Sequence, residues 1–254
     1  MPGSIVMRDV PKQEARIDLF SGPIQGGFRG FSLVPTGAHY VSVKYQATHR
    51  GAWCYVEDGS AAVLHFNEES AELVLVEDEE FRQLAASGAM SAALLPYPAE
   101  IAPRWRQLTS HIRPQDVDDF QVRPPQASSD GASRFDAALA ELGEAGLLAD
   151  FQLSYLTFAL EPAPKEAFQR WASLLQSAYN AGEHRIAANS SFFAAFVDIL
   201  IAQFGMISDD LLMAQTVTGY ANYLIEDMED TGIAELENKA AELKAYLRER
   251  GALS

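Results

Sequence analysis

The residues of this chain that could carry out chemistry are five histidines, one cysteine and two groups of carboxylates. The histidines are His39, His49, His65, His111 and His184. No two of them stand two or four residues apart, the spacings at which strands and helices present pairs of metal ligands. Cys54 has no second ligand near it in the sequence. We therefore expect no metal site, and only a site assembled from distant residues stays open.

The patterns for nucleophilic catalysis and phosphate binding are also absent from the sequence. It contains no Gly-x-Ser-x-Gly elbow. Cys54 alternates with Trp53 and Tyr55 in a strand-like segment, so we interpret it as a small core residue rather than a reactive thiol. The segment 26–30, Gly-Gly-Phe-Arg-Gly, lacks the Gly-Lys-Ser/Thr ending of a phosphate loop. We interpret it as a turn with positive φ angles.

Two acidic groups could bind a cation or a basic partner. Their members are Asp116, Asp118 and Asp119 in the first group, and Glu226, Asp227, Glu229 and Asp230 in the second. Neither has the alternating acids and central glycine of a calcium loop. We interpret both as solvated faces, with docking of a basic partner as the alternative.

A closely spaced set of residues near the N-terminus is typical of turns between short strands. Its members are Ile17, Asp18, Phe28, Gly30, Pro35, Gly37 and His39. We expect Asp18 to accept hydrogen bonds from the amides of the glycine-rich turn. We expect His39 to be half-buried, with a ring nitrogen that ties down the Pro35–Gly37 turn. A ligand-contacting or pH-sensing His39 is the alternative.

The elements that must position these residues begin with short strands. Alternating polar and apolar residues from 15 to 76 predict an antiparallel β-rich domain, a curled sheet or a sandwich. The predicted strands are 16–19, 31–34, 39–45, 53–56, 61–66 and 72–76. Trailing helices are expected from 78 to 88 and from 100 to 110, which completes a domain over 15–121. Residues 1–14 are expected to form a flexible lead-in.

The second half of the chain has helical periodicity. Residues 122–133 combine Pro-Pro, small polar residues and Asp-Gly, which predicts a Pro/Ser linker. The rest, 134–254, predicts an all-α domain, so the fold class is α+β. The predicted helices are 135–148, 151–160, 165–181, 192–204, 208–225 and 233–250, with Gly182 as a C-cap. Trp105 and Trp171 stand at core spacing, and we interpret them as packing residues rather than interface anchors.

The composition excludes several classes of partner. The chain has 254 residues, a net charge of −16 and 19 Lys+Arg without a basic stripe. Direct binding of nucleic acid or of an anionic membrane is therefore not expected. No apolar run approaches the roughly 20 residues that span a bilayer. A single cysteine and the lack of a secretory apolar segment predict a cytoplasmic location, or a nuclear one in a eukaryote.

Four sequence blocks, in order, resemble the Aar-two family of cistron-splicing factors. The first block is the set around Asp18 and His39. The second is Tyr97-Pro98 followed by Trp105-Arg-Gln-Leu-Thr, and the third is Phe151-Gln152-Leu-Ser-Tyr-Leu. The fourth is Ala167-Phe-Gln-Arg-Trp171 with Leu174-Leu175, then Ile199-Leu200 and Gln203-Phe204. The resemblance identifies the following as structural motif residues: Asp18, Phe28, Gly30, Pro35, Gly37, His39, Tyr97, Pro98, Trp105, Gln152 and Trp171.

The resemblance implies a non-enzymatic assembly factor for mRNA splicing, with no cofactor. Family members bind the large scaffold protein of the U-five small nuclear ribonucleoprotein (U-five snRNP) and hold it in an assembly-stage form until a helicase replaces them. For this chain, the resemblance implies binding and masking of a larger protein, which is that scaffold if the organism splices introns. The surface that binds is not specified by the motifs.

A second hypothesis comes from another class of protein. Five lysines against 14 arginines, with abundant alanine, are typical of a GC-rich genome. The alternative is therefore a divergent prokaryotic relative that acts as a small-molecule sensor or an enzyme, with a deep pocket near His39 and the domain junction. The last helix, 233–250, carries only about two and a half heptads, so we expect a monomer or a weak dimer.

Overall fold

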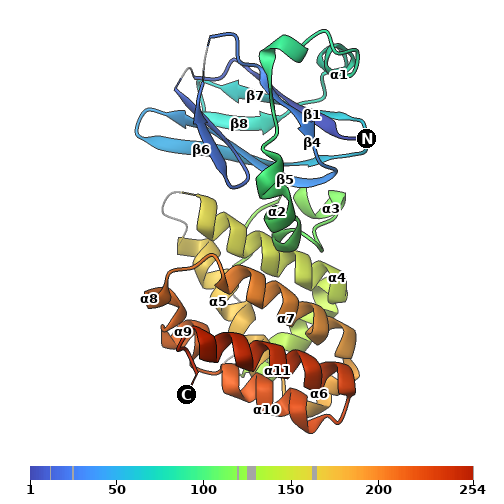
Figure 1. Ribbon diagram of the computed structural model, residues 1–254, viewed down its shortest axis with the longest axis vertical. Helices are drawn as coiled ribbons and strands as arrows, with labels where there is room; N and C mark the ends of the chain where they lie inside the picture. Colours follow the sequence, from blue (N-terminus) through green and yellow to red (C-terminus); the bar gives the residue numbers. More distant parts are fainter. Residues whose placement is uncertain (12, 25, 119, 125–129, 162–164, 254) are drawn as a thin grey trace. The chain divides into compact units, whose positions relative to one another are not determined.

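The structure of the chain is a computed structural model (Figure 1). It describes every residue except 12, 25, 119, 125–129, 162–164 and 254. Contacts divide the chain into two compact units, Met1–Phe120 with Leu160–Ala163, and Gln121–Ala159 with Pro164–Ser254. The first unit is β-rich and the second is helical. The predicted α+β class, with a β-rich region followed by a helical region, is confirmed.

The first unit contains a mixed sheet of five strands. In spatial order they are β8 (Glu72–Leu75), β7 (Ala61–Asn67), β1 (Gly3–Arg8), β4 (Gly30–Val34) and β9 (Leu94–Pro96). β1 pairs antiparallel with β4 and parallel with β7, and β4 pairs parallel with β9. The antiparallel arrangement expected from the sequence therefore fails for two pairs of strands.

The predicted flexible lead-in over 1–14 is wrong. Residues Gly3–Arg8 form the central strand of the mixed sheet, and Ile5, Val6 and Met7 are fully buried. Ile5 and Met7 face one apolar cluster, and Val6 faces another on the opposite side. A strand that is covered on both faces shows a continuous apolar run instead of alternation, so the period-2 pattern did not identify it.

The second sheet has four antiparallel strands. They are β3 (Phe20–Pro23), β2 (Glu14–Ile17), β5 (Gly37–Tyr45) and β6 (Thr48–Val56) in spatial order. Both sheets contribute to one apolar core, which contains Phe31 and Leu64 from the first sheet and Ile17 and Val41 from the second. The two sheets therefore share a core in the manner of a sandwich.

Short helices complete the first unit. α1 (Glu79–Ala86) begins where predicted, because the Asp78 carboxylate accepts a hydrogen bond from the Phe81 N–H at 3.1 Å. α1 contributes Ala85 to the cluster that contains Val6 and Val63, and so covers that face of the mixed sheet. The remaining elements are η1 (Ser91–Ala93), η2 (Ala99–Ile101), α2 (Ala102–Leu108) and α3 (Pro114–Val117).

The second unit is built from eight described helices. They are α4 (Gly131–Leu160), α5 (Lys165–Tyr179), α6 (Glu183–Ala188), α7 (Ser190–Phe204), α8 (Asp209–Leu212), α9 (Gln215–Thr218), α10 (Ala221–Asp230) and α11 (Ala234–Glu249). α4 joins two predicted helices across a break at Gly143, where φ is 67° and ψ is 170°. The predicted linker extends too far, because α4 begins at Gly131, and its residues 125–129 lie outside the described part of the chain.

Two predicted helix boundaries in this unit need correction. Gly182, expected to end α5, is instead the N-cap of α6, with φ 83°. The single helix expected over 208–225 is divided into α8, α9 and the first half of α10. Ser208 caps only α8, and the Thr218 hydroxyl donates to the Leu212 carbonyl at 2.7 Å across the short turn between α8 and α9. Such local side-chain bonds compete with a continuous helical ladder.

Gly30 is expected to be intolerant of any side chain. Its φ is 129°, and a Cβ atom there would lie 1.9 Å from the Ile5 carbonyl oxygen on the adjacent strand β1. We expect Gly30→Ala to lower the free energy of unfolding by at least about 3 kcal/mol, since strain and overlap act together.

The urea dependence of Cys54 thiol labelling would measure this loss, because Cys54 is buried in the same unit. Gly26→Ala is the matched control, since a Cβ there meets no atom within 4 Å. Equal stability of the two variants would contradict the close packing of β1 against β4.

Candidate functional site

The motif residues of the first unit meet at a buried carboxylate. Asp18 follows β2, with φ 54°. Its Oδ2 accepts hydrogen bonds from His39 Nδ1 at 2.7 Å and from the Tyr97 hydroxyl at 2.8 Å, and its Oδ1 accepts from the Tyr40 N–H at 3.0 Å. Asp18 is 2% exposed and His39 is 1% exposed. We call Asp18, His39 and Tyr97 the carboxylate node.

The geometry of the node favours a doubly protonated His39 ring. Nδ1 faces the Asp18 carboxylate, and Nε2 lies 2.8 Å from the Pro35 carbonyl oxygen. Both neighbours are hydrogen-bond acceptors, so each ring nitrogen can donate a hydrogen bond when it carries a proton. Burial acts to lower the pKa of His39, but the charge of Asp18 and the hydrogen bonds to Asp18 and Pro35 outweigh it, so the pKa is raised.

Two expectations about this set are corrected by the structure. Among the described residues, no amide of the glycine-rich turn donates to Asp18. Its partners among the described residues are a backbone amide in β5, a histidine and a tyrosine. His39 is fully buried rather than half-buried, although it does hold the Pro35 carbonyl as expected. The node therefore joins β2, β5 and the residue after β9, three segments that are distant in sequence.

The node makes stability depend on pH. Since the folded-state pKa of His39 lies above its unfolded value of 6.5, the stabilisation is complete below about pH 6.5 and is lost as the pH rises through the folded-state pKa. We expect the difference in unfolding free energy between the parent protein and His39→Gln to shrink above about pH 6.5, by at most about 1.4 kcal/mol per pH unit.

Urea titrations at several pH values would measure that slope. His65→Gln is the control, because His65 forms a 3.1 Å pair with Asp9 that is largely exposed. A difference that stays constant from about pH 6 to about pH 9 would contradict a charged His39 ring.

The other motif residues of the first unit hold the same region together. Trp105, on α2, donates from Nε1 to the Ala38 carbonyl at 2.8 Å, and its ring stacks on Trp53 at 6.1 Å. Phe28 packs edge-on against Phe31 at 5.3 Å. Pro98 precedes η2 as its N-cap residue. The Trp105 contacts attach α2 to the four-stranded sheet, and the Phe28 ring packs on β4 of the five-stranded sheet.

Gly37 has a conformational role. Its φ is 138°, and a Cβ atom there would meet nothing within 4 Å. Glycine is therefore favoured at this position by the backbone conformation rather than by lack of space. The residue begins β5, so its conformation sets the direction in which His39 enters the core.

A second buried network lies in the helical unit. Trp171, on α5, donates from Nε1 to Oε1 of Gln203 at 2.8 Å. The Gln203 carbonyl accepts from the Tyr155 hydroxyl at 3.0 Å. Gln152 is fully buried on the same helix as Tyr155. The third and fourth motif blocks therefore supply the polar contacts between α4, α5 and α7.

The sequence pattern did not identify a buried ion pair in this unit. Arg170 contacts Oδ2 of Asp150 through Nε at 3.0 Å and through Nη2 at 2.5 Å, and its Nη1 reaches the Pro124 carbonyl at 3.4 Å. Both side chains are at most 5% exposed. The signal that could have identified the pair is one charged residue of each sign beside the most apolar stretches of two predicted helices.

Several other residues that the sequence offered for catalysis or cation binding are buried or already paired. Burial raises the pKa of the Cys54 thiol, and the charge of Asp18 adds to this, which disfavours the reactive thiolate. Asp116 is bound by the Arg113 side chain at 2.8 Å, and Glu229 is bound by Lys244 at 2.8 Å. Asp119, a member of the first acidic group, lies outside the described residues.

The described residues contain neither a cluster suited to a metal ion nor a helix suited to crossing a membrane. No group of three or more His, Cys, Asp or Glu side chains in that part of the chain is arranged to hold a metal ion. Within the same residues, none of the helices combines the length and apolar character that crossing a bilayer requires.

The fold and the two buried networks define a class of protein with a β-rich first unit and a helical second unit, each held together by its own motif residues. Comparison with family models agrees: residues 1–122 match the AAR2 N-terminal domain, and residues 120–253 match the AAR2 C-terminal repeat region. The chain belongs to the AAR2 (Aar-two) family. Comparison with individual curated proteins found no match.

Membership of the family has general consequences for function. AAR2 proteins are splicing and assembly factors, a class that is non-catalytic and acts through a protein partner. The matches cover nearly the whole chain and include both motif-bearing units. The resemblance that the sequence blocks indicated is confirmed at the level of the family.

Proposed function

We propose that this chain is a non-enzymatic assembly factor that binds and masks a face of a larger protein in the cytoplasm. Its membership of the AAR2 family supports a role in assembly and a protein partner. If the organism splices introns, the partner is the scaffold protein of the U-five particle. The chain itself, as a monomer or a weak dimer, then occupies the partner's surface and delays another binder.

The observation that carries the proposal is that the polar atoms of the motif residues point into the first unit and bond to one another. The polar atoms of Asp18, His39 and Tyr97 are bonded to one another inside the first unit. A general acid or base must reach the proton that it transfers. Asp18 and His39 are at most 2% exposed, so their arrangement supports a scaffold rather than a reaction centre.

The sensor or enzyme alternative has less support. It predicts a pocket with converging polar groups near His39. Two hollows open on the first unit, and none of the motif residues lines either of them. The second lies beside the carboxylate node, because Tyr40, the neighbour of His39, lines it together with His49 and Glu161. The polar atoms of the node itself are bonded to one another and do not face either hollow.

Affinity capture followed by competition would test the proposal. The tagged chain is expected to retain one large protein from an extract of its own organism in a near-equimolar amount. A binder of that protein, added afterwards, should be excluded while the chain is bound and should displace it only in large excess.

Retention without exclusion would mean that the chain binds but does not mask. Failure to retain any protein, together with a metabolite that raises the chain's melting temperature, would favour the sensor or enzyme alternative.

A further inference from the structure

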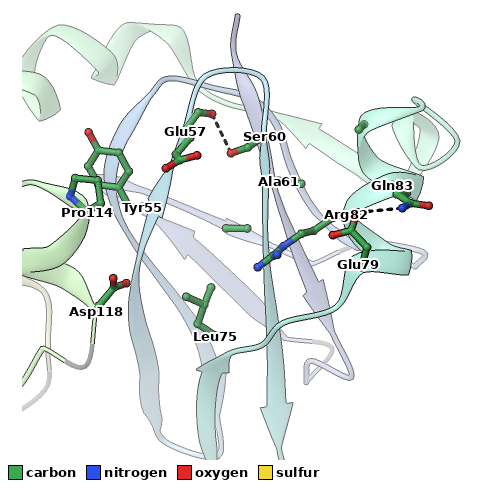
Figure 2. Close-up of a pocket in the computed structure, with 12 residues that line it drawn as sticks. Tyr55, Glu57, Ser60, Ala61, Leu75, Glu79, Arg82, Gln83, Pro114 and Asp118 are labelled. Carbon is green, nitrogen blue, oxygen red and sulfur yellow. Dashed lines mark hydrogen bonds between the residues drawn. The ribbon is translucent and has the colours of Figure 1, made fainter.

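A hollow of about 450 Å³ opens on the surface of the first unit (Figure 2). It is bounded by the end of β6, the start of β7, the end of β8, one side of α1 and the short helix α3. The lining residues are Tyr55, Glu57, Ser60, Ala61, Ala62, Leu75, Glu79, Arg82, Gln83, Ala86, Pro114 and Asp118. Its volume falls within the range of sites that take a ligand or a short peptide.

One wall of the hollow is a free strand edge. β8 covers β7 only as far as the Leu64–Leu75 pair, and the Val76 N–H then donates to the Val63 carbonyl at 2.9 Å. Backbone groups of alternate residues in a strand point to the same side. The N–H and C=O of Ala61 therefore point to the side that β8 has left, and they have no backbone partner there among the described residues.

The charge of the lining is mostly negative. Glu57, Glu79 and Asp118 contribute three carboxylates. Among the described residues that line it, Arg82 is the one cation; its side chain reaches into the hollow from α1 and is already paired with Glu77 at 2.8 Å. A cationic side chain would therefore be attracted to this hollow, and an acidic one repelled.

The hollow also offers apolar contact to an incoming chain. Leu75 ends β8, is 45% exposed and points into the space (Figure 2). The ring of Tyr55 lies beside Pro114, on the side of the hollow away from α1 (Figure 2). An aromatic face and a leucine can accommodate the aliphatic part of a lysine or arginine side chain, whose charged end then reaches the carboxylates.

We propose that this hollow takes an extended, basic segment of a protein partner, which adds to β7 at Ala61 in line with β8. Main-chain hydrogen bonds to a strand edge give affinity, and flanking side chains give specificity. Here the flanking carboxylates of Glu57 and Asp118 select lysine or arginine. The inference rests on the proposed function, because it assigns a surface and a chemistry to the protein partner.

NMR titration of the isotope-labelled full chain would test this with a defined probe. The probe is a capped six-residue peptide of alternating valine and lysine, and the matched peptides carry glutamate for lysine or a central proline. We expect the lysine peptide to shift the amide resonances of Ala61, Ala62 and Tyr55. The glutamate and proline peptides should bind at least about tenfold more weakly, because one lacks the charge and the other lacks an amide donor.

Matched variants separate local charge from net charge. The double variant Glu57→Gln with Asp118→Asn should weaken the lysine peptide about tenfold. Glu226→Gln with Asp230→Asn removes two exposed acids from the other unit and should leave binding unchanged. Equal weakening by both pairs, equal binding of the glutamate peptide, or no shift at Ala61 would overturn the proposal. Shifts of the same amides by inorganic phosphate instead would identify an anion site at Arg82.

The same variants distinguish failure of this inference from failure of the proposed function. If the parent chain captures a protein and the Glu57→Gln, Asp118→Asn chain captures it equally well, the hollow is not the docking site, while the proposed function stands. If the parent chain captures no protein, the proposed function fails. The peptide titration still decides whether the hollow binds basic strands.

Discussion

Replacing Asp18 by asparagine is expected to lower the free energy of unfolding of the first unit by about 3–5 kcal/mol, the loss typical of removing one partner from a buried ion pair. The change keeps the size of the side chain but removes its charge. It leaves the His39 ring without its counter-charge and gives the Tyr97 hydroxyl a poorer acceptor. The loss reflects the desolvated partners as much as the bond itself.

The burial of Cys54 in the same unit supplies the measurement. Its thiol becomes reactive only when the unit opens, so the urea dependence of thiol labelling reports the unit's stability. Asp9→Asn is the matched control, because Asp9 forms an exposed pair with His65 and should change stability by less than about 1 kcal/mol. If Asp18→Asn were as mild as its control, the carboxylate node would not hold the unit together.

The second large effect is expected at Arg170. Arg170→Ala should lower the free energy of unfolding of the helical unit by about 3–5 kcal/mol, because it leaves the buried Asp150 carboxylate without a cation. It also removes the donor that reaches the Pro124 carbonyl. The double variant Asp150→Leu with Arg170→Met should recover most of the loss, since no buried charge is then left unpaired.

Far-ultraviolet circular dichroism at the helical band during urea unfolding would follow this unit, because its long helices supply most of the helical residues of the described chain. Arg185→Ala is the control, since Arg185 forms a similar two-point pair with Asp136 that is largely exposed. We expect the control to leave the urea midpoint of the unit almost unchanged, because an exposed ion pair contributes little to stability. A double variant no more stable than Arg170→Ala would show that the charges themselves are not responsible.

Several elements of the fold could be predicted because their signals are local. β5 alternates in residue type from Val41 to Tyr45 and is rich in β-branched and aromatic residues, so the strand at 39–45 follows from the local sequence. α1 begins at an aspartate that caps it and has two glutamates in its first turn. α11 carries Leu236, Ala240 and Leu243 at core spacing, and all three are fully buried.

The elements that the sequence did not predict depend on contacts between segments that are distant in the chain. β1 is specified by its partners β7 and β4, which lie far along the chain, and its short apolar run carries no period. Parallel pairing likewise depends on how segments return to the sheet, which local sequence does not encode. The break between α8 and α9 within 208–225 is accompanied by a side-chain bond from Thr218 to the Leu212 carbonyl, which local periodicity does not reveal.

The candidate site was predicted in part for the same reasons. The bond from His39 to Pro35 spans four residues and follows from turn geometry. The bonds that unite Asp18 with His39 and Tyr97 span 21 and 79 residues, and only the fold brings them together. The free edge at Ala61 depends on where β8 ends relative to β7, which the positions of the predicted strands leave undetermined.

Native mass spectrometry of the tagged chain, isolated from its own organism, tests the central claim most directly. The claim is that this protein exists to occupy the surface of another protein. We predict a one-to-one complex with a single larger protein that dissociates as the ionic strength rises, since exposed charges contribute to docking. The chain found alone with a bound small molecule, and in no complex with a protein, would contradict the account.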